Sequence, residues 1–325
     1  MAHARARGGC LLRARIGRGV GRTRARSRRS RRARRLRRHR TRAKGSCGRR
    51  AARNVTAIRV RAPATTANLG PGFDCAAAAL DFWNELVVGD GGEPQLAHLG
   101  VRAFALLADP SGRSFVFETP IPQERGLGSS ASVIALGLVA GAAAAGVDPP
   151  VEELLELGLP LEGHPDNLAA ALAGGVTAVV DGGVVRLADG APAVAIAVVP
   201  ADAVRTDAAR ASLPETVPHA DAAFTVGHAV LLGAALATGS AELFAAAAAD
   251  RLHEPYRAKT APLLEELRSA KIDGALAVTL SGSGPTVIVW ARPEDASACY
   301  DDVSKRLPDA QVLRLETTPS GAGPL

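Results

Sequence analysis

A glycine- and serine-rich segment, Glu124 to Ala131, has the residue types of a phosphate-binding loop. It reads Glu-Arg-Gly-Leu-Gly-Ser-Ser-Ala and precedes a long uncharged run. Its two glycines would let the backbone approach a ligand closely. A helix starting at Ser129 would offer free N–H groups and a positive dipole end to an anion. The Walker A pattern and its lysine are absent. An ordinary helix N-terminus, with serines that only satisfy backbone donors, fits the segment about equally well.

Two further glycine-rich segments stand far from this one in the sequence. Pro63 to Asp74 reads Pro-Ala-Thr-Thr-Ala-Asn-Leu-Gly-Pro-Gly-Phe-Asp, and Ser281 to Pro285 reads Ser-Gly-Ser-Gly-Pro. Each alone is explained as a turn between neighbouring elements. Their joint occurrence in one chain is hard to explain by turn chemistry, so we expect the three segments to form one site.

The elements that must position these segments are mixed helices and strands. Alternating apolar and polar residues predict a strand at residues 56–61, and short apolar runs predict strands at residues 114–118, 176–180, 184–187, 194–199, 275–280, 286–290 and 311–315. Helices are predicted at residues 98–107, 129–147, 151–157, 167–173, 224–250 and 260–270, with Pro160 ending the third of them early. The uncharged run from Ser129 to Val147 is mostly Ala, Gly and Ser, which indicates a buried helix rather than a membrane span. The irregular order favours an α+β fold.

Charge divides the chain into a basic tail and an acidic body. Residues 1–53 contain twenty-one Arg and one Lys, and no acidic residue precedes Asp74. The remaining 17 basic and 32 acidic residues give residues 54–325 a net charge of −15. The net negative charge of residues 54–325 does not favour binding to nucleic acid. We expect it to contain two domains, residues 54–200 and 201–325.

Three interpretations of residues 1–53 remain open. They are an Arg-rich arm that binds nucleic acid or polyphosphate, a transit peptide, or sequence upstream of a true start near Val55. The last is favoured, because folded sequence begins abruptly there and valine is how an alternative start codon would be translated. A non-catalytic protein that binds nucleic acid through this arm is an alternative function.

Cysteine usage indicates a reducing compartment. Cys10, Cys47, Cys75 and Cys299 are scattered, with no CxxC pair and no histidine cluster. Free thiols and a cytoplasmic location are therefore expected, without a membrane partner.

The three glycine-rich segments resemble the three motifs of the galactokinase, homoserine kinase, mevalonate kinase and phosphomevalonate kinase superfamily, over nearly all of residues 55–320. Within it, Leu-Glu-Gly-His-Pro-Asp-Asn at residues 161–167, followed by Gly174-Gly175, resembles the homoserine kinase family. Residues 63–80 are similar to that family's first motif, PATxANLGPGFDxxGxAL. The resemblance implies a two-domain fold, N-terminal ribosomal-protein-S5-domain-2-like and C-terminal ferredoxin-like α/β sandwich. It also implies ATP-dependent phosphorylation of L-homoserine in threonine biosynthesis. A related kinase for another alcohol is the nearest alternative.

The resemblance also implies which residues hold the nucleotide and its metal. The residues expected around the ATP phosphates are Arg125, Gly126, Leu127, Gly128, Ser129, Ser130 and Ala131. Mg²⁺ is expected on Ser130 and Glu162, with Glu156 as the alternative carboxylate. Few carboxylates together with phosphate oxygens and waters suit Mg²⁺.

On the acceptor side, the resemblance implies substrate contacts from Asn68, Asp74, His164, Asn167, Arg210 and Arg257. Arg210 and Arg257 would bind the carboxylate, for which arginine is well shaped, and Asp74 suits the ammonium. Asn167, Thr206 and Asp166 are expected at the reacting groups. In this family the proton is thought to pass to the phosphate itself, so Asp166 as a base stays an alternative.

Two departures from the family pattern stand out. Ala77 replaces a usual glycine, where its methyl could crowd the first motif, and the Gly89–Pro94 region is short near the expected adenine pocket. The sequence leaves a homodimer open.

Overall fold

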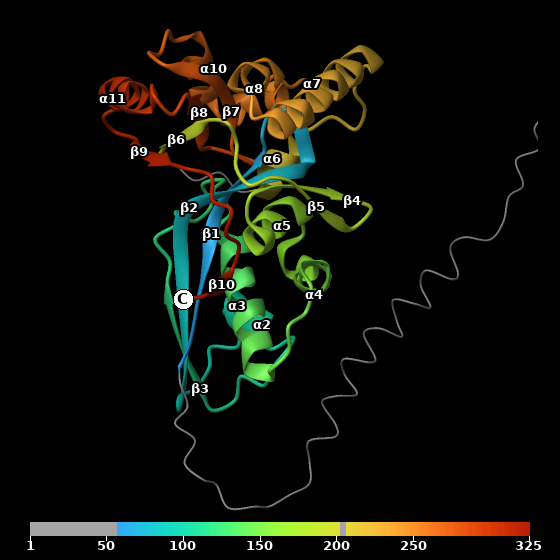
Figure 1. Cartoon of the computed structure of the whole chain (residues 1–325), viewed down its shortest axis with the longest axis vertical. Helices are drawn as coiled ribbons and strands as arrows, with labels where there is room; N and C mark the ends of the chain where they lie inside the picture. The colour runs from blue at the N-terminus through green and yellow to red at the C-terminus, as the bar shows by residue number, and fades with distance from the viewer. Residues whose placement is uncertain (1–56, 202–205) are drawn as a thin grey trace, which may run out of the picture. The chain divides into compact units, whose positions relative to one another are not determined.

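The computed structural model describes residues 57–201 and 206–325, with the side chains of residues 206–208 also left out (Figure 1). The predictions for the Arg-rich segment 1–53 lie outside the described residues. Everything below concerns the compact unit that contains the described residues.

The first sheet carries the first glycine-rich segment. Its strands are β1 (Ile58–Asn68), β2 (Gly72–Asp90), β3 (Arg113–Glu118), β4 (Val176–Val180), β5 (Gly183–Ala188) and β10 (Gly323–Pro324). Their order is β10-β1-β2-β4-β5, β3 also pairs with β2, and all pairs are antiparallel. The first motif is therefore not only a turn: β1 and β2 extend through it up to the bend at residues 69–71.

Four helices, α2 (Leu99–Phe104), α3 (Ser129–Ala145), α4 (Val151–Glu162) and α5 (Pro165–Ala173), gather beside this sheet (Figure 1). Most of α3 is buried, as predicted, because its apolar side chains pack against β1, β2 and the other three helices. The prediction that Pro160 ends α4 early is wrong. Pro160 and Glu156 are both exposed, so the hydrogen bond lost at the proline lies on the solvent side of the helix.

The second sheet has the strand order β7-β8-β6-β9, made of β6 (Val194–Val199), β7 (Ala275–Leu280), β8 (Val287–Ala291) and β9 (Gln311–Leu315). All three pairs are antiparallel. With helices between β6 and β7 and between β8 and β9, this is the βαββαβ arrangement of a ferredoxin-like sandwich. It confirms the predicted C-terminal fold.

Six further helical elements accompany the second sheet: α6 (Thr206–Ala211), α7 (His219–Thr238), α8 (Ala241–Ala247), α9 (Glu254–Arg257), α10 (Pro262–Ser269) and α11 (Ala296–Arg306), with a 3₁₀ turn at Ala258–Thr260. The single helix predicted for residues 224–250 is wrong. Gly239 has a φ of 67°, which ends α7, and Ser240 begins α8 by accepting a hydrogen bond from the Leu243 amide at 3.2 Å.

Helix α7 is, among the described residues, the one helix long and apolar enough to cross a membrane. One such helix is weak evidence for a span, and α7 packs Leu232, Ala235 and Leu236 into the core shared with the second sheet.

Each sheet includes a segment from the other side of residue 200, the expected domain boundary. β6 precedes that residue but pairs with β8 and β9. In the opposite direction, the C-terminal segment 316–325 returns to the first sheet, where the Thr318 amide donates to the Ala79 carbonyl at 3.0 Å and β10 pairs with β1 (Figure 1). Next to it, the unusual Ala77 packs with Ala67 and Ala170 in a small apolar cluster.

The returning segment explains the Gly174-Gly175 pair and gives a first prediction. A Cβ at Gly174 (φ +71°) would lie 2.3 Å from the Pro319 carbonyl oxygen, whereas one at Gly182 (φ +79°) would meet nothing within 4 Å. Gly182→Ala should lower the free energy of unfolding by about 1 kcal/mol through backbone strain alone. Gly174→Ala should lower it by about 2–4 kcal/mol, since a collision is added to a backbone conformation (φ 71°, ψ 176°) that is essentially confined to glycine. Urea unfolding of both variants measures the difference, and equal losses would contradict the packing role of the C-terminal segment.

Candidate active site

The three glycine-rich segments meet at one hydroxyl. Ser281 Oγ lies 2.8 Å from Thr66 Oγ1 of the first segment and 2.6 Å from the Gly126 carbonyl oxygen of the second. The Gly282 amide donates to the Ala67 carbonyl at 3.2 Å. A Cβ at Gly126 would lie 2.4 Å from the Ser281 carbonyl oxygen, so the contact requires glycine. The expectation that the segments form one site agrees with this arrangement.

A cavity of about 230 Å³ opens beside this junction. It is lined by Asn68, Asp74, Glu124, Arg125, Gly126, Gly128, Ser129, Ser130, Glu162, His164, Asp166, Asn167, Arg210, Arg257, Gly282 and Ser283. Four acidic residues and three arginines therefore face a small space, which suits ligands that carry both signs of charge.

The N-terminus of α3 forms one wall of the cavity. Gly128 precedes the helix with a φ of 64° and has no side chain to cap it. The first hydrogen bond of the helix runs from the Ser132 amide to the Gly128 carbonyl at 2.9 Å. The three amides before Ser132 thus have no partner within the helix, and they lie at its positive end. This is an anion site of the kind that binds phosphate.

The two serines of this loop face different ways. Ser129 is buried, and its hydroxyl donates to the Ile121 carbonyl at 3.3 Å. Ser130 is exposed, and its hydroxyl lies 2.7 Å from Oε2 of Glu162, the last residue of α4. Ser130 is therefore the serine whose hydroxyl faces a carboxylate that lines the cavity.

A second prediction follows from the crowding at Gly128. A Cβ there would lie 1.8 Å from Thr65 Oγ1, which donates to Asn167 Oδ1 at 2.6 Å. Gly128→Ala should therefore displace Thr65 and the loop, and lower kcat/KM for ATP on the order of 10²-fold.

The control for this substitution is Gly146, at the other end of α3. It has a similar φ of 67°, and a Cβ there would meet nothing within 4 Å. Gly146→Ala should cost about 1 kcal/mol of stability and leave kinetics unchanged. Equal kinetic losses in the two variants would mean that backbone strain, and not crowding against Thr65, causes the loss of activity.

Glu162 and Ser130 fit a magnesium ion. Burial raises the pKa of Glu162 to about 7, with the nearby Asp166 carboxylate adding to the shift and the Ser130 hydrogen bond opposing it. Among the described residues no cluster of three or more His, Cys, Asp or Glu could hold a metal alone. One carboxylate and one hydroxyl, completed by phosphate oxygens and water, is the donor set that Mg²⁺ accepts. Glu156, the alternative carboxylate, is exposed and does not line the cavity.

The opposite wall holds two arginines with different surroundings. Arg210 of α6 forms an ion pair with Asp74, and both side chains are partly exposed. Arg257 of α9 is 3% exposed, and its buried Nε has no hydrogen-bond partner among the described residues. A buried guanidinium with an unsatisfied edge is costly unless an anion binds there.

Asn68 lines the cavity, but both ends of its amide are used within the protein. Its Nδ2 donates to the Gly282 carbonyl at 2.9 Å, and its Oδ1 accepts from the Asp74 amide at 3.1 Å. Asn68, Leu69 and Asp74 have positive φ angles of 73°, 48° and 55°. Such strain at a ligand site is held by the surrounding contacts, and here Asn68 supplies two of them.

His164, Asp166 and Asn167 come from the start of α5 and the residue before it. Asp166 is almost fully buried, which raises the pKa of its carboxyl, and its Oδ1 accepts from the Asn167 amide at 2.7 Å. Asn167 Oδ1 is held by Thr65, so its Nδ2 is the group left for a ligand.

Comparison with known proteins places this chain in a family. The sequence matches the profile of the GHMP kinases N terminal domain at residues 95–175 and that of the GHMP kinases C terminal at residues 233–309. It is 43% identical over 271 residues to homoserine kinase from Streptomyces avermitilis, which covers 75% of this chain and 88% of the relative. The chain belongs to the homoserine kinase family.

A second relative supports this assignment, and a solved structure shares the fold. The protein from Gloeobacter violaceus is 38% identical over 289 residues, covering 81% of this chain and 97% of the relative. The crystal structure of homoserine kinase from Cytophaga hutchinsonii has a TM-score of 0.74 at 23% identity and covers 86% of this chain and 100% of its own, which shows a shared fold. The predicted family and its two-domain α+β fold are confirmed.

Not every residue expected from the homoserine kinase resemblance lines the cavity. The side chains of Leu127 and Ala131 are buried in the core, so only their backbone is placed to meet a ligand. Thr206 begins α6, and its side chain lies outside the described part. The site residues absent from the sequence-based set are Glu124, Gly282 and Ser283. All three lie within or beside segments whose glycines marked them.

Proposed function

We propose that this chain transfers the γ-phosphoryl group of ATP to the side-chain hydroxyl of L-homoserine, forming O-phospho-L-homoserine. The observation that carries the proposal is the pairing, in one cavity, of an uncapped helix N-terminus with the partly unsatisfied Arg257 guanidinium. The first fits a triphosphate and the second fits the carboxylate of an amino acid.

On the nucleotide side, the amides at the start of α3 would bind the phosphate oxygens. Ser130 and Glu162 would hold Mg²⁺, which neutralises charge on the phosphates during transfer. Arg125 contributes to the shape of the loop, because its Nε donates to the Pro200 carbonyl at 3.1 Å and its guanidinium also contacts the Gln123 and Ala201 carbonyls.

On the acceptor side, Asp74 and Arg210 neutralise each other in this structure. An amino acid can replace that pair, because its ammonium would take Asp74 while its carboxylate would take Arg210 and Arg257. A substrate with only one of these charges would leave Asp74 or Arg210 without a partner. This exchange favours a zwitterionic alcohol over a simple hydroxy acid such as mevalonate.

The chemical step needs mainly positioning and charge stabilisation. With the backbone held by Asp74 and the two arginines, the hydroxyl arm of homoserine can reach toward α3 and Asn167. The buried Asp166 is near enough to the site to be considered as a base, and transfer of the proton to the phosphate itself is the alternative that we favour.

The test is ATP turnover by the full chain with Mg²⁺ and four acceptors: L-homoserine, L-threonine, L-serine and mevalonate. We expect homoserine to be the preferred acceptor. The phosphorylated product is identified by mass spectrometry. Preference for another alcohol would retain kinase chemistry but overturn the substrate. No turnover by folded protein with any acceptor would contradict the proposed reaction.

A further inference from the structure

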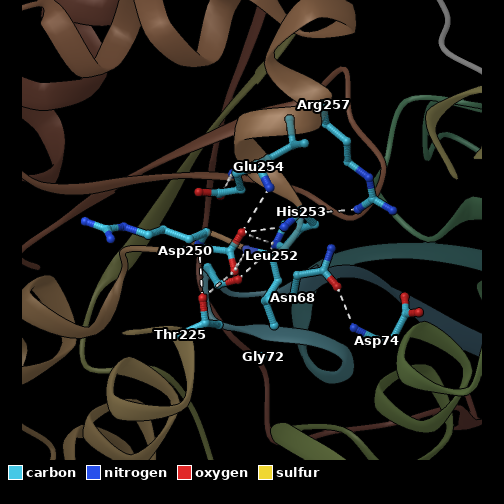
Figure 2. Close-up of polar contacts among 12 residues, drawn as sticks. Asn68, Gly72, Asp74, Thr225, Asp250, Leu252, His253, Glu254 and Arg257 are labelled. Atoms are coloured by element: carbon cyan, nitrogen blue, oxygen red, sulfur yellow. Dashed lines mark hydrogen bonds and ion pairs between the residues drawn. The ribbon is translucent and has the colours of Figure 1, made fainter. Parts of the chain in front are cut away.

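The short helix α9 carries Arg257 into the site and is itself held from several directions (Figure 2). At its start, Asp250 Oδ2 accepts hydrogen bonds from the amides of His253 and Glu254 at 2.8 and 2.9 Å. Asp250 also accepts one from Thr225 of α7 at 3.3 Å. The backbone that bears His253 is therefore fixed independently of any ligand.

His253 lies between the first glycine-rich segment and Arg257. It is fully buried, and its ring stacks on Phe73 with centroids 5.1 Å apart. Its Nε2 is 2.9 Å from the Gly70 carbonyl oxygen, and its Nδ1 is 3.3 Å from NH1 of Arg257. Arg257 also meets the Asn68–Asp74 bend at the Gly282 carbonyl oxygen, which accepts from both Asn68 Nδ2 and Arg257 NH1.

These two contacts determine the tautomer of the ring. A carbonyl oxygen only accepts, so Nε2 must carry the hydrogen that it donates to Gly70. A guanidinium only donates, so Nδ1 must be the unprotonated acceptor for Arg257. Burial lowers the pKa of His253 to about 4, against the nearby Asp250 carboxylate. The ring is therefore neutral at physiological pH, and both of its nitrogens are used.

Arg257 depends on this acceptor. Its NH1 has two hydrogen-bond partners, the Gly282 carbonyl oxygen at 3.0 Å and His253 Nδ1. Together they hold one side of the guanidinium against the third glycine-rich segment and leave the Nε edge unsatisfied. A guanidinium fixed in this way loses less side-chain entropy when an anion binds.

We propose that His253 is a positioning residue, whose neutral Nε2–H tautomer orients Arg257 for the carboxylate of the acceptor and ties it to the first glycine-rich segment. This inference rests on the proposed role of Arg257 in binding that carboxylate. It assigns His253 no contact with substrate.

Two substitutions separate the two hydrogen bonds of the ring. In His253→Gln the side-chain amide can still donate to Gly70, but the acceptor for Arg257 is lost. In His253→Asn the amide oxygen can replace Nδ1 as that acceptor. His253→Gln should raise KM for L-homoserine about tenfold, with kcat and KM for ATP within about twofold of the wild type, and His253→Asn should restore most of the loss.

A double-substitution cycle with Arg257→Ala tests whether His253 acts through Arg257. In the Arg257→Ala background, His253→Gln should change KM for homoserine by less than about twofold. An undiminished tenfold effect in that background would overturn the inference. If Arg257→Ala alone leaves KM unchanged, the proposed carboxylate contact fails instead, so the two failures are distinguishable. Arg257→Lys replaces Arg257→Ala in the cycle if the latter does not fold.

A measurement on the wild-type protein does not depend on any variant folding. The ¹⁵N chemical shifts of the His253 ring should report the neutral Nε2–H tautomer between pH 6 and 8. The Nδ1–H tautomer, or an imidazolium in this range, would overturn the proposal.

Discussion

Glu162→Gln is expected to lower kcat on the order of 10²- to 10³-fold, because the neutral amide removes the carboxylate that we propose holds Mg²⁺ together with Ser130. Steady-state kinetics across a magnesium titration measures the effect. The same titration of the wild type should show apparent Mg²⁺ affinity falling as pH drops below about 7, because protonation of Glu162 then competes with the metal. The variant should lose this pH dependence.

The matched control is Glu156→Gln in the same helix. Glu156 is exposed and is not among the residues that line the cavity, so the kcat and magnesium dependence of this variant should equal those of the wild type. Equal losses in both variants would show that the helix, and not the Glu162 carboxylate, matters.

Arg257→Ala is expected to raise KM for L-homoserine about 30- to 100-fold, as loss of a charge-assisted hydrogen bond to a carboxylate would do. KM for ATP should stay within about twofold, because we propose that the guanidinium binds the acceptor and not the nucleotide. Initial-rate kinetics with each substrate varied in turn measures both constants.

Arg251→Ala is the control from the same segment. Arg251 is half-exposed, where it pairs with Asp221 and covers the Phe224 ring. Its loss should leave both KM values unchanged. An increase in KM for ATP as large as that for homoserine in Arg257→Ala would contradict a contact confined to the acceptor carboxylate.

The segments that carry the site residues, and their order along the chain, were predictable from residue types. Glycines at 126 and 128 before an uncharged helix indicate a phosphate loop because local backbone freedom and helix dipoles act over a few residues. Short apolar strands bounded by turn residues were predicted at their observed bounds, as β7 and β9 show, whereas β1 extends seven residues beyond the predicted end. The long strand β2, the helices α6, α9 and α11 and the short strand β10 were missed. The strand β10 exists only because β1 lies beside it.

Residue types alone did not separate neighbouring residues of one type. The family resemblance favoured Ser130 and Glu162, and the tertiary structure shows how each differs from its neighbour. Ser129 and Ser130 are equivalent in sequence, yet one faces Ile121 and the other Glu162. Glu156 and Glu162 lie on the same helix, and the packing of α4 directs only the second toward α3. Helical periodicity gives the direction of a side chain relative to its own helix, and the position of the next element must come from the fold.

The sequence by itself thus determined the family, the α+β class and the segments that build the site. Only the tertiary structure showed that the Asn68 side chain forms hydrogen bonds with the Gly282 carbonyl and the Asp74 amide. It also showed that the His253 ring forms hydrogen bonds with both the Gly70 carbonyl and Arg257. These contacts span up to 214 positions. Local propensity carries no information over such separations, because a hydrogen bond between distant segments depends on the packing of everything between them.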